Sequence, residues 1–335
     1  MIGRFKEPLS TAGEAFAEGM EYAAVVDSAV PSRVLPLSSV EDEYYSWLLG
    51  VNSSLSVPLG NFELQVLDGI NEALTSVETV CASLPRLPDV LPKLMRALRD
   101  ERASWEEIAN IVGQDALLVV EVLHLANSPC FRASSKITCL EQVVMQLGVV
   151  GLREVVITVS LKPIMKFEGS HYYRHAGRKI WSQALAAAVA CRSLAAEIPG
   201  ARFEAYLAGL VHNVGMVVVM QTLQRLSRGG ETPRSMAFRE QVLPLMKRLS
   251  FLIARQWQLP EATLQALEDQ LGADGRHASP LGGILQRGIW LGMLHTRVRE
   301  GCGEGVEAYL LSLPEEQRRA AEQAMAEIGG GANPG

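Results

Sequence analysis

The chain has 335 residues, of which 48% are hydrophobic and 20% are charged, a balance typical of a globular protein with a sizeable core. It carries 31 basic and 37 acidic residues, which gives a formal net charge of −6. A net-acidic chain has no general attraction for nucleic acid or for an anionic membrane, so we expect no nucleic-acid partner. At about 100–200 residues per domain, the length predicts two domains.

Aromatic residues make up only 6% of the chain, while Ala and Gly recur throughout. This composition favours closely packed helices over a β-sandwich, which would be richer in aromatic and β-branched residues. The cysteines are scattered, odd in number and without a C-x-x-C pair, which argues against a zinc knuckle or a disulfide framework. Because the first 20 residues also lack the apolar core of a signal peptide, we expect a cytoplasmic protein. The five cysteines are Cys81, Cys130, Cys139, Cys191 and Cys302.

Residues 1–83 are predicted to form a helical accessory region. Glu14–Val26 could form a short helix, and a capping box from Ser39 to Asp42 predicts the start of a second one. Apolar residues spaced three and four apart predict a longer helix over Phe62–Cys81.

Three aromatic residues lie in the second of these helices, namely Tyr44, Tyr45 and Trp47. If their rings are exposed, they would form a surface for a protein partner. The alternative is that they complete the core, and the sequence leaves both interpretations open.

From Leu84 onward the pattern predicts dense helix. Capping boxes at Ser104–Glu107 and Thr138–Glu141 predict two helix starts, and Gly148 is expected to end the second helix. The segment Leu152–Leu161 is rich in Val and Ile, but a lone strand would have no partner, so we expect a helix there too.

One later stretch, Ala205–Gln224, holds no formally charged residue and has to be tested as a membrane span. Its middle is His212-Asn213, its apolar part is shorter than the roughly 20 residues that a span needs, and polar groups at mid-depth would be costly in lipid. We therefore expect one buried helix over Phe203–Leu223 and no membrane span. Pro244 is expected to kink or split the helix Met236–Trp257.

The C-terminal part continues in the same way. Leu281–Val298 has a helical pattern, and Ser312–Glu315 predicts the cap of a final helix. The glycine-rich end, Gly329–Gly335, is predicted to be disordered. With no convincing strand pair, the chain is predicted to be all-α.

Several motifs occur in an order that resembles the HDOD domain, the HD-related output domain of bacterial signalling proteins. Each motif alone is weak, but five in order at sensible spacing make a specific match over about residues 84–223. A looser W-x-L-P follows at Trp257–Pro260. The five are L-P-R-L-P at Leu84–Pro88, L-A-N-S at Leu125–Ser128, the L-E-Q-V…L-G…L-R stretch over Leu140–Arg153, W-S-Q-A-L-A at Trp181–Ala186, and A-G-L-V-H-N-V-G at Ala208–Gly215.

The resemblance implies an HD-like multi-helix bundle over residues 84–300, with the helical extension 1–83 before it and a C-terminal helix and tail over 301–335. In the related HD phosphohydrolases, a histidine on one helix and a His-Asp pair on the next hold a divalent metal. The metal lowers the pKa of a bound water and shields the charge of the phosphate.

In this chain the implied ligand set is broken. Gln183 stands at the first histidine, Asn213 stands at the aspartate, and only His212 is kept. Where related domains often carry a His-His pair, this chain has Leu267–Gln270. One imidazole with two neutral amides is a poor ligand set for a dication, so we expect no metal, no cofactor and no phosphohydrolase activity.

Two interpretations of Gln183, His212 and Asn213 remain open. They could form a buried cluster of hydrogen-bonded side chains, with Gln183 as partner of the other two. They could instead form the floor of a pocket for a small ligand. The pair His171 and His175 has no nearby carboxylate, which favours a surface role over metal binding.

We therefore expect a non-enzymatic signal-transduction module that binds other signalling proteins, whose identity the sequence does not give. One alternative is a sensor of a nucleotide second messenger, such as a cyclic dinucleotide or guanosine tetraphosphate. A less favoured alternative is a divergent metal-dependent phosphohydrolase.

Overall fold

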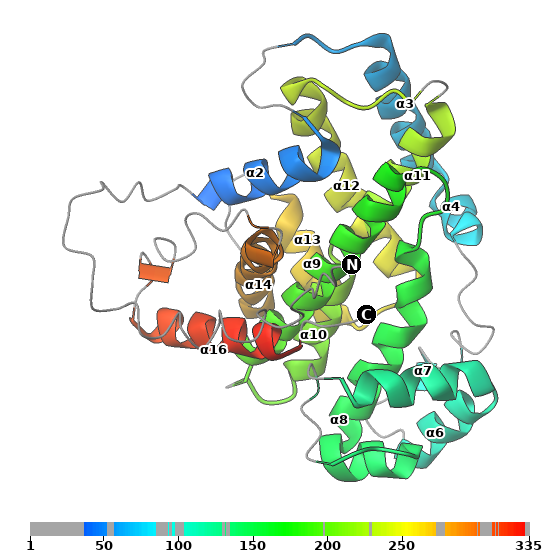
Figure 1. Cartoon of the computed structure of the whole chain (residues 1–335), viewed down its shortest axis with the longest axis vertical. Helices are drawn as coiled ribbons and strands as arrows, with labels where there is room; N and C mark the ends of the chain where they lie inside the picture. The colour runs from blue at the N-terminus through cyan, green and yellow to red at the C-terminus, as the bar shows by residue number, and fades with distance from the viewer. Residues whose placement is uncertain are drawn as a thin grey trace, which may run out of the picture. The chain divides into compact units, whose positions relative to one another are not determined.

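The structure is a computed structural model, and it describes residues 37–51, 57–84, 93, 96–97, 104–128, 131, 135–196, 198–227, 230–272, 279–299, 301, 310–311, 313 and 315–331. Every regular element in these ranges is a helix, which confirms the predicted all-α fold (Figure 1). In chain order the elements are α2 (Leu37–Leu49), α3 (Asn61–Thr75), α4 (Val77–Ser83), α6 (Trp105–Gly113), α7 (Ala116–Ala126), α8 (Leu140–Leu161), the 3-10 turn η2 (Lys162–Met165), α9 (His171–Leu194), α10 (Arg202–Val211), α11 (Val214–Leu226), α12 (Met236–Gln256), α13 (Glu261–Glu268), the 3-10 turn η3 (Asp269–Leu271), α14 (Pro280–Arg299) and α16 (Glu315–Gly331).

Local sequence signals explain part of this pattern. The predicted cap at Ser104 is confirmed, because its hydroxyl accepts a hydrogen bond from the amide of Glu107 at 3.3 Å. The predicted box at Thr138 is wrong: α8 begins after Cys139 without a side-chain cap, and the Thr138 amide donates to the side chain of Gln142. Ser39 caps nothing, since α2 already begins at Leu37.

Gly148 breaks α8, as its expected role as a helix end implies. Its φ of 72° lies in the left-handed region that glycine adopts at little cost. The chain then returns to helix, and the Val/Ile-rich Leu152–Leu161 is helical and mostly buried, as predicted.

Other boundaries differ from the expectations. Phe62–Cys81 forms two helices, α3 and α4, that meet at Ser76, and Pro244 lies inside an α12 that is not split. Gly329–Gly331 continue α16 as helix, so the predicted disorder is wrong for these three residues. The expected helix Glu14–Val26 lies outside the described residues.

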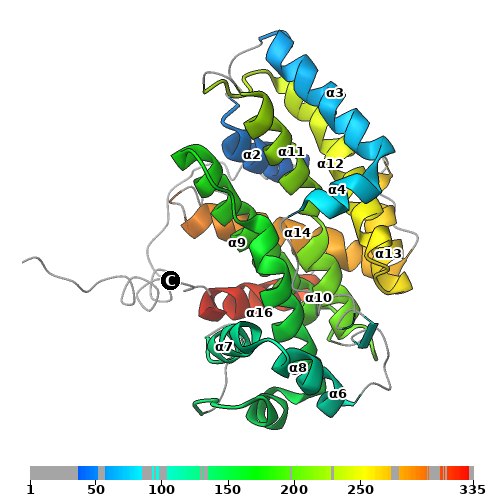
Figure 2. The same cartoon turned by 90° about the vertical axis from the view of Figure 1, so that its right-hand side faces the viewer.

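Three helices meet so closely that glycine is required at the contacts. α9 packs against α10 and α14 (Figure 2). A Cβ added to Gly209 of α10 would lie 2.7 Å from the Ala188 Cα, and one added to Gly292 of α14 would lie 2.7 Å from the Ala187 nitrogen. Both distances are shorter than van der Waals contact allows, so small residues on all three helices set the spacing of the bundle.

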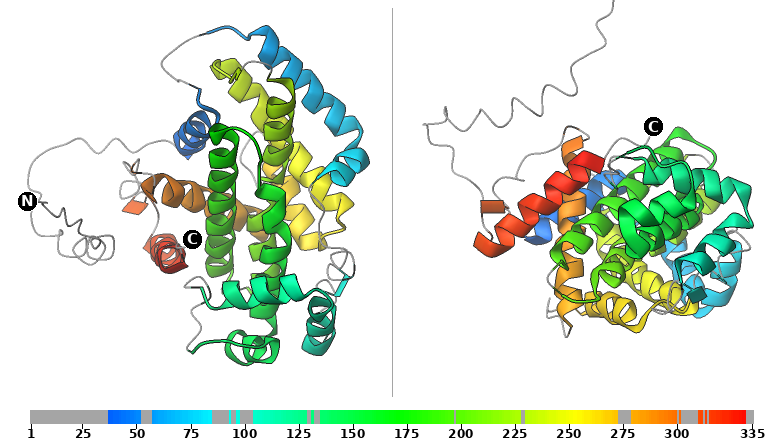
Figure 3. Two further views of the ribbon diagram at one scale, coloured as in Figure 1. Left: turned by 45° about the vertical axis from the view of Figure 1, so that its right-hand side comes forward. Right: turned by 90° about the horizontal axis from the view of Figure 1, so that it is seen from below.

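A buried carboxylate joins the N-terminal α3 to α12. α3 runs beside α11 and α12, as the blue helix next to the yellow-green ones in Figure 3 shows. The Glu63 carboxylate accepts four hydrogen bonds, from the amides of Gly60, Arg234 and Ser235 and from the Ser235 hydroxyl. Burial raises the pKa of this carboxyl group, but the hydrogen bonds outweigh burial and hold its pKa below the usual value.

The last helix, α16, packs against α9 and α14. Its Glu327 carboxylate accepts hydrogen bonds from the Ser193 hydroxyl at 2.7 Å and from Arg192 at 3.3 Å. Arg192 also pairs with the buried Glu154 of α8 at 2.8 Å. This network ties the C-terminal helix to the bundle.

Two described stretches, Leu140–Met165 and Arg202–Leu226, are long and apolar enough to cross a membrane by length and composition. Within their apolar windows, 61% and 94% of residues are buried inside the fold. The second stretch is also interrupted by a turn at His212 and Asn213. Such burial is typical of core helices and agrees with the predicted buried segment.

The tight contact at Gly209 generates a stability prediction. We expect Gly209→Ala to lower the free energy of unfolding by about 1–3 kcal/mol, because the added methyl group meets backbone atoms of α9. Gly113→Ala at the end of α6 is the control, since nothing lies within 4 Å of its added Cβ. Urea unfolding followed by circular dichroism should show a loss for the first variant only. Equal stability of the two variants would contradict the close approach.

Candidate functional site

His212 and Asn213 lie in a turn between two helices. The expectation of one continuous helix over Phe203–Leu223 is wrong, because α10 ends at Val211 and α11 begins at Val214. The backbone amide of Gly215, near the start of α11, donates a hydrogen bond to the Ser250 hydroxyl of α12 at 2.9 Å. This amide therefore has a partner even though the helix is interrupted before it. The turn lets the two polar side chains leave the chain in different directions.

Gln183 and Asn213 form a buried amide pair. Gln183 of α9 is 0% exposed and Asn213 is 2% exposed. The Asn213 amide nitrogen donates to the Gln183 side-chain oxygen at 2.6 Å and to the backbone oxygen of Ile180 at 3.2 Å. Gln183 in turn donates to the Ile289 carbonyl of α14 at 3.4 Å. The hydrogen bond expected between Gln183 and Asn213 is therefore present, and it joins α9 to the α10–α11 turn.

His212 makes a different set of contacts. Its Nδ1 lies 2.6 Å from the Gly209 carbonyl oxygen, which can only accept, so Nδ1 carries the proton. Burial lowers the pKa of His212 to about 4, with a further contribution from the charge of Lys247, so the ring is neutral at pH 7. The Nε2 atom is buried and has no hydrogen-bond partner among the described residues. It presents a free lone pair.

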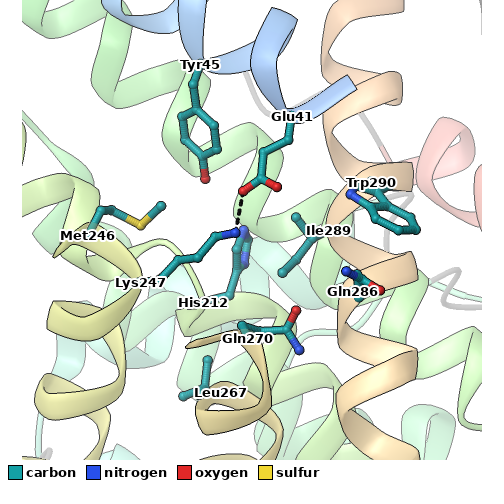
Figure 4. Close-up of a pocket in the computed structure, with 10 residues that line it drawn as sticks. All are labelled: Glu41, Tyr45, His212, Met246, Lys247, Leu267, Gln270, Gln286, Ile289 and Trp290. Atoms are coloured by element: carbon teal, nitrogen blue, oxygen red, sulfur yellow. Dashed lines mark ion pairs between the residues drawn. The ribbon is translucent and has the colours of Figure 1, made fainter. Parts of the chain in front are cut away.

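That lone pair faces a small pocket. The room inside it is about 30 Å³, roughly what one or two water molecules occupy. Gln183 and Asn213 are not among the side chains that line it, so the structure does not bring the three candidate residues into one pocket. Leu267 and Gln270, at the place of the missing histidine pair, do line it. The lining residues are Glu41, Tyr45, His212, Met246, Lys247, Leu267, Gln270, Gln286, Ile289 and Trp290 (Figure 4).

The outer side of the pocket is formed by α2, which lies before the segment that carries the HDOD motifs. Glu41 and Tyr45 come from α2, and the Glu41 carboxylate forms an ion pair with Lys247 of α12 at 2.6 Å beside the His212 ring (Figure 4). Helix α2 of the N-terminal accessory region thus covers the His212 pocket.

The three aromatic residues of α2 belong to this cover. Tyr44 and Tyr45 are 1% and 2% exposed, so the expectation that they offer an exposed partner surface is corrected: they complete the core. Trp47 is half-buried, and the Lys179 ammonium lies 3.4 Å from the centre of its ring. The anchoring of α2 against α9, α12 and α14 explains the burial.

The residues at this site do not fit the divalent metal that the HD superfamily implies. Among the described residues, no group of three or more His, Cys, Asp or Glu side chains could hold an ion. The two amides already hydrogen bond to each other and to backbone carbonyls, and the nearby Glu41 carboxylate is paired with Lys247. Among the described residues of this site, the atoms left without a hydrogen-bond partner are His212 Nε2 and the neutral amide oxygen Asn213 Oδ1. One imidazole and one amide oxygen are a poor ligand set for a dication.

The other histidine candidates add no ligand set. The rings of His171 and His175 stack with centroids 5.7 Å apart at the start of α9, and Arg178 lies beside His175. Glu41 and Lys247 were not among the predicted site residues, because the contact between α2 and α12 joins distant parts of the chain. The acidic run Glu41-Asp42-Glu43 was the available signal.

The amide pair generates a pH-dependent prediction. We expect Asn213→Asp to cost about 3 kcal/mol of stability at pH 7, because a buried carboxylate would face the Ile180 carbonyl oxygen. Burial raises the pKa of this carboxyl group in the folded state above its unfolded value of about 3.9. The loss of stability is therefore small near pH 4 and grows as the pH rises. Chemical unfolding at both pH values measures it, with the exposed Asn71→Asp of α3 as control. A deficit independent of pH would contradict the burial of this amide.

Comparison with known sequences gives a family match. The model of the HDOD domain matches residues 84–271, which is more than half of the chain. An "Uncharacterized protein" of Treponema pallidum (strain Nichols) is 20% identical over 244 residues, covering 68% of this chain and 45% of the relative. The chain thus spans less than half the length of that relative.

Solved structures share the fold. A "Putative metal-dependent phosphohydrolase" from Shewanella amazonensis SB2B has a TM-score of 0.52 at 19% identity, covering 80% of this chain and 100% of its own. A "Putative signal transduction protein" from Marinobacter aquaeolei VT8 has a TM-score of 0.50 at 18% identity, covering 96% of this chain and 73% of its own. Both likenesses concern the arrangement of helices. With the motifs, the all-α bundle and the family match in place, this chain belongs to the HDOD domain family.

Proposed function

We propose that the chain is a cytoplasmic signal-transduction module that acts by binding other proteins and does not hydrolyse phosphate esters at its HD-derived site. The observation that carries the proposal is the amide pair. The Asn213 amide nitrogen donates to the Gln183 side chain and to the backbone of α9, and the Gln183 amide nitrogen donates to the backbone of α14. The Asn213 Oδ1 atom is buried without a partner among the described residues.

The chemistry of phosphate-ester hydrolysis explains why this pair matters. An HD-type reaction needs anionic and imidazole ligands that hold a dication and lower the pKa of a bound water. Neutral amides donate little electron density and leave the charge of the ion unbalanced in a buried site. The side chains that replace the ligands here act as structural hydrogen-bonding groups.

The position of α2 supports the same proposal. Glu41 and Tyr45 fill the outer side of the pocket, and the Glu41–Lys247 ion pair lies beside His212. A phosphodiester would have to displace this helix before it reached the imidazole. The covered site therefore favours binding functions that use the outside of the bundle.

Two comparisons favour a role in signalling. The matching family is that of the HDOD domain, which the resemblance of the motifs associates with output domains of bacterial signalling proteins. The similar structure from Marinobacter aquaeolei VT8 is described as a putative signal transduction protein. The phosphohydrolase description of the Shewanella structure points the other way, and the amides at Gln183 and Asn213 are our reason for favouring a signalling role without catalysis.

The proposal predicts the outcome of a direct assay. The purified full chain should show no stoichiometric divalent metal and no turnover of bis(p-nitrophenyl) phosphate above the buffer rate with Mg²⁺, Mn²⁺ or Zn²⁺. His212→Ala should leave this background unchanged, as should the control His171→Ala at an exposed position. Turnover that disappears in His212→Ala and persists in His171→Ala would refute the proposal.

A second candidate, a small-ligand sensor, has one observation in its favour: the buried Nε2 of His212 faces the pocket without a partner. A ligand that donates a hydrogen bond to this lone pair would stabilise the folded chain by mass action. Thermal unfolding with cyclic dinucleotides and guanosine tetraphosphate tests this function. The sensor function predicts a rise in melting temperature that His212→Ala abolishes, and unchanged curves would count against it.

A further inference from the structure

The groove that holds α2 is built for an acidic helix. Three consecutive acidic residues of α2 each pair with a basic residue of the bundle: Glu41 with Lys247, Asp42 with Arg239, and Glu43 with Arg297. The basic residues come from α12 and α14. A single turn of helix therefore carries the charge complement of the whole groove.

Apolar anchors fix the register of the helix. Val40, Tyr44 and Leu48 repeat at intervals of four residues and are 1%, 1% and 2% exposed. Apolar residues that are three, four or seven positions apart are the usual anchors of a helix bound in a groove. Polar contacts hold the backbone as well, since Tyr172 donates to the Leu49 carbonyl at 3.2 Å and Arg239 donates to the Asp42 carbonyl at 3.2 Å.

Arg239 makes the requirement for an acidic occupant strict. Its side chain is only 4% exposed. Apart from a distant contact with Glu240 at 3.9 Å, its guanidinium bonds to groups of α2, namely the Asp42 carboxylate and carbonyl and the Ser46 hydroxyl. A neutral helix in the same place would keep this guanidinium buried but remove the Asp42 carboxylate that pairs with it, which is strongly unfavourable.

From this charge and anchor pattern we infer that the α2 groove is the docking site for an acidic amphipathic helix of a protein partner, and that α2 is its resident occupant in the unbound chain. The inference rests on the proposed binding function and names its surface. The partner helix carries two or three consecutive acidic residues directly before an aromatic anchor. Its binding displaces α2 and uncovers the pocket at His212.

The test uses the full chain with its own α2 weakened. In one variant Glu41, Asp42 and Glu43 are all replaced (Glu41→Lys, Asp42→Lys, Glu43→Lys), which sets like charges against the groove. The matched control makes the same change of formal charge at exposed positions of α3 and α4 (Asp68→Lys, Glu72→Lys, Glu78→Lys). Amide hydrogen exchange over residues 37–49 should rise at least tenfold in the first variant only.

The probe is a fluorescein-labelled peptide with the sequence of Leu37–Val51, titrated by fluorescence anisotropy. We expect it to bind the α2 variant at least tenfold more tightly than the wild type and the control, because the groove is vacated. A peptide with lysine at its three acidic positions should not bind. If α2 is released but the native peptide fails to bind, or binds no better than the lysine peptide, the inference is wrong. Unchanged hydrogen exchange in the α2 variant would also overturn it, since the acidic residues would then not hold the helix.

A milder variant covers the case in which the lysine variant fails to fold. Glu41→Gln with Glu43→Gln removes two ion pairs without adding positive charge, and about a threefold gain in peptide affinity over the wild type is expected. An affinity equal to that of the wild type would refute the inference. Peptide binding is independent of the turnover assay: phosphodiester turnover would refute the proposed function alone, whereas loss of peptide binding would refute only this docking site.

Discussion

The close approach of α9 to α10 and α14 is the constraint on which the site depends. Gly209 and Gly292 lie against the backbone of Ala187 and Ala188, so the three helices approach more closely than any larger side chain at these positions would allow. Gln183 lies one turn of α9 before these alanines, and the turn with His212 and Asn213 follows directly after α10. The close contacts therefore place a glutamine, an asparagine and a histidine at one level of the bundle, where each polar group has to find a partner.

How these polar groups are satisfied decides what the site can do. The amides of Gln183 and Asn213 are complementary, because each offers both a donor and an acceptor, and they close a hydrogen-bonded link without any ion. A carboxylate and an imidazole at the same positions would need a cation to balance them. His212 donates from Nδ1 to the Gly209 carbonyl of α10 and keeps Nε2 without a partner among the described residues, so its ring offers a neutral acceptor beside the covered pocket.

The sequence predicted those features that depend on local patterns. The all-helical fold, the break at Gly148, the cap at Ser104 and the amide pair follow from periodicity, glycine chemistry and the match of motifs. The turn at His212 was missed because its cause is a tertiary contact, the hydrogen bond between Gly215 and Ser250 on a distant helix. Glu41 and Lys247 were missed for the same reason, since they are 206 residues apart in the chain and nothing local links them. Tyr44 and Tyr45 show why burial is hard to predict from sequence. A run of aromatic residues fits a surface or a core equally well until its neighbours in the fold are known.

This chain has amides where the related enzymes have charged metal ligands, and it has a helix over the pocket. These two properties suit each other physically. A helix that brings Glu41 beside a loaded dication site would compete for the ion and block the substrate. With the ligands replaced by amides, no ion competes for the Glu41 carboxylate, which pairs instead with Lys247. The guanidinium of Arg239 is buried beneath α2 and pairs with the Asp42 carboxylate, so a neutral helix in this place would leave a buried charge unpaired and an acidic helix is favoured. The amide pair and the acidic α2 thus fit one electrostatic arrangement, in which the Glu41 carboxylate that lines the His212 pocket is paired with Lys247.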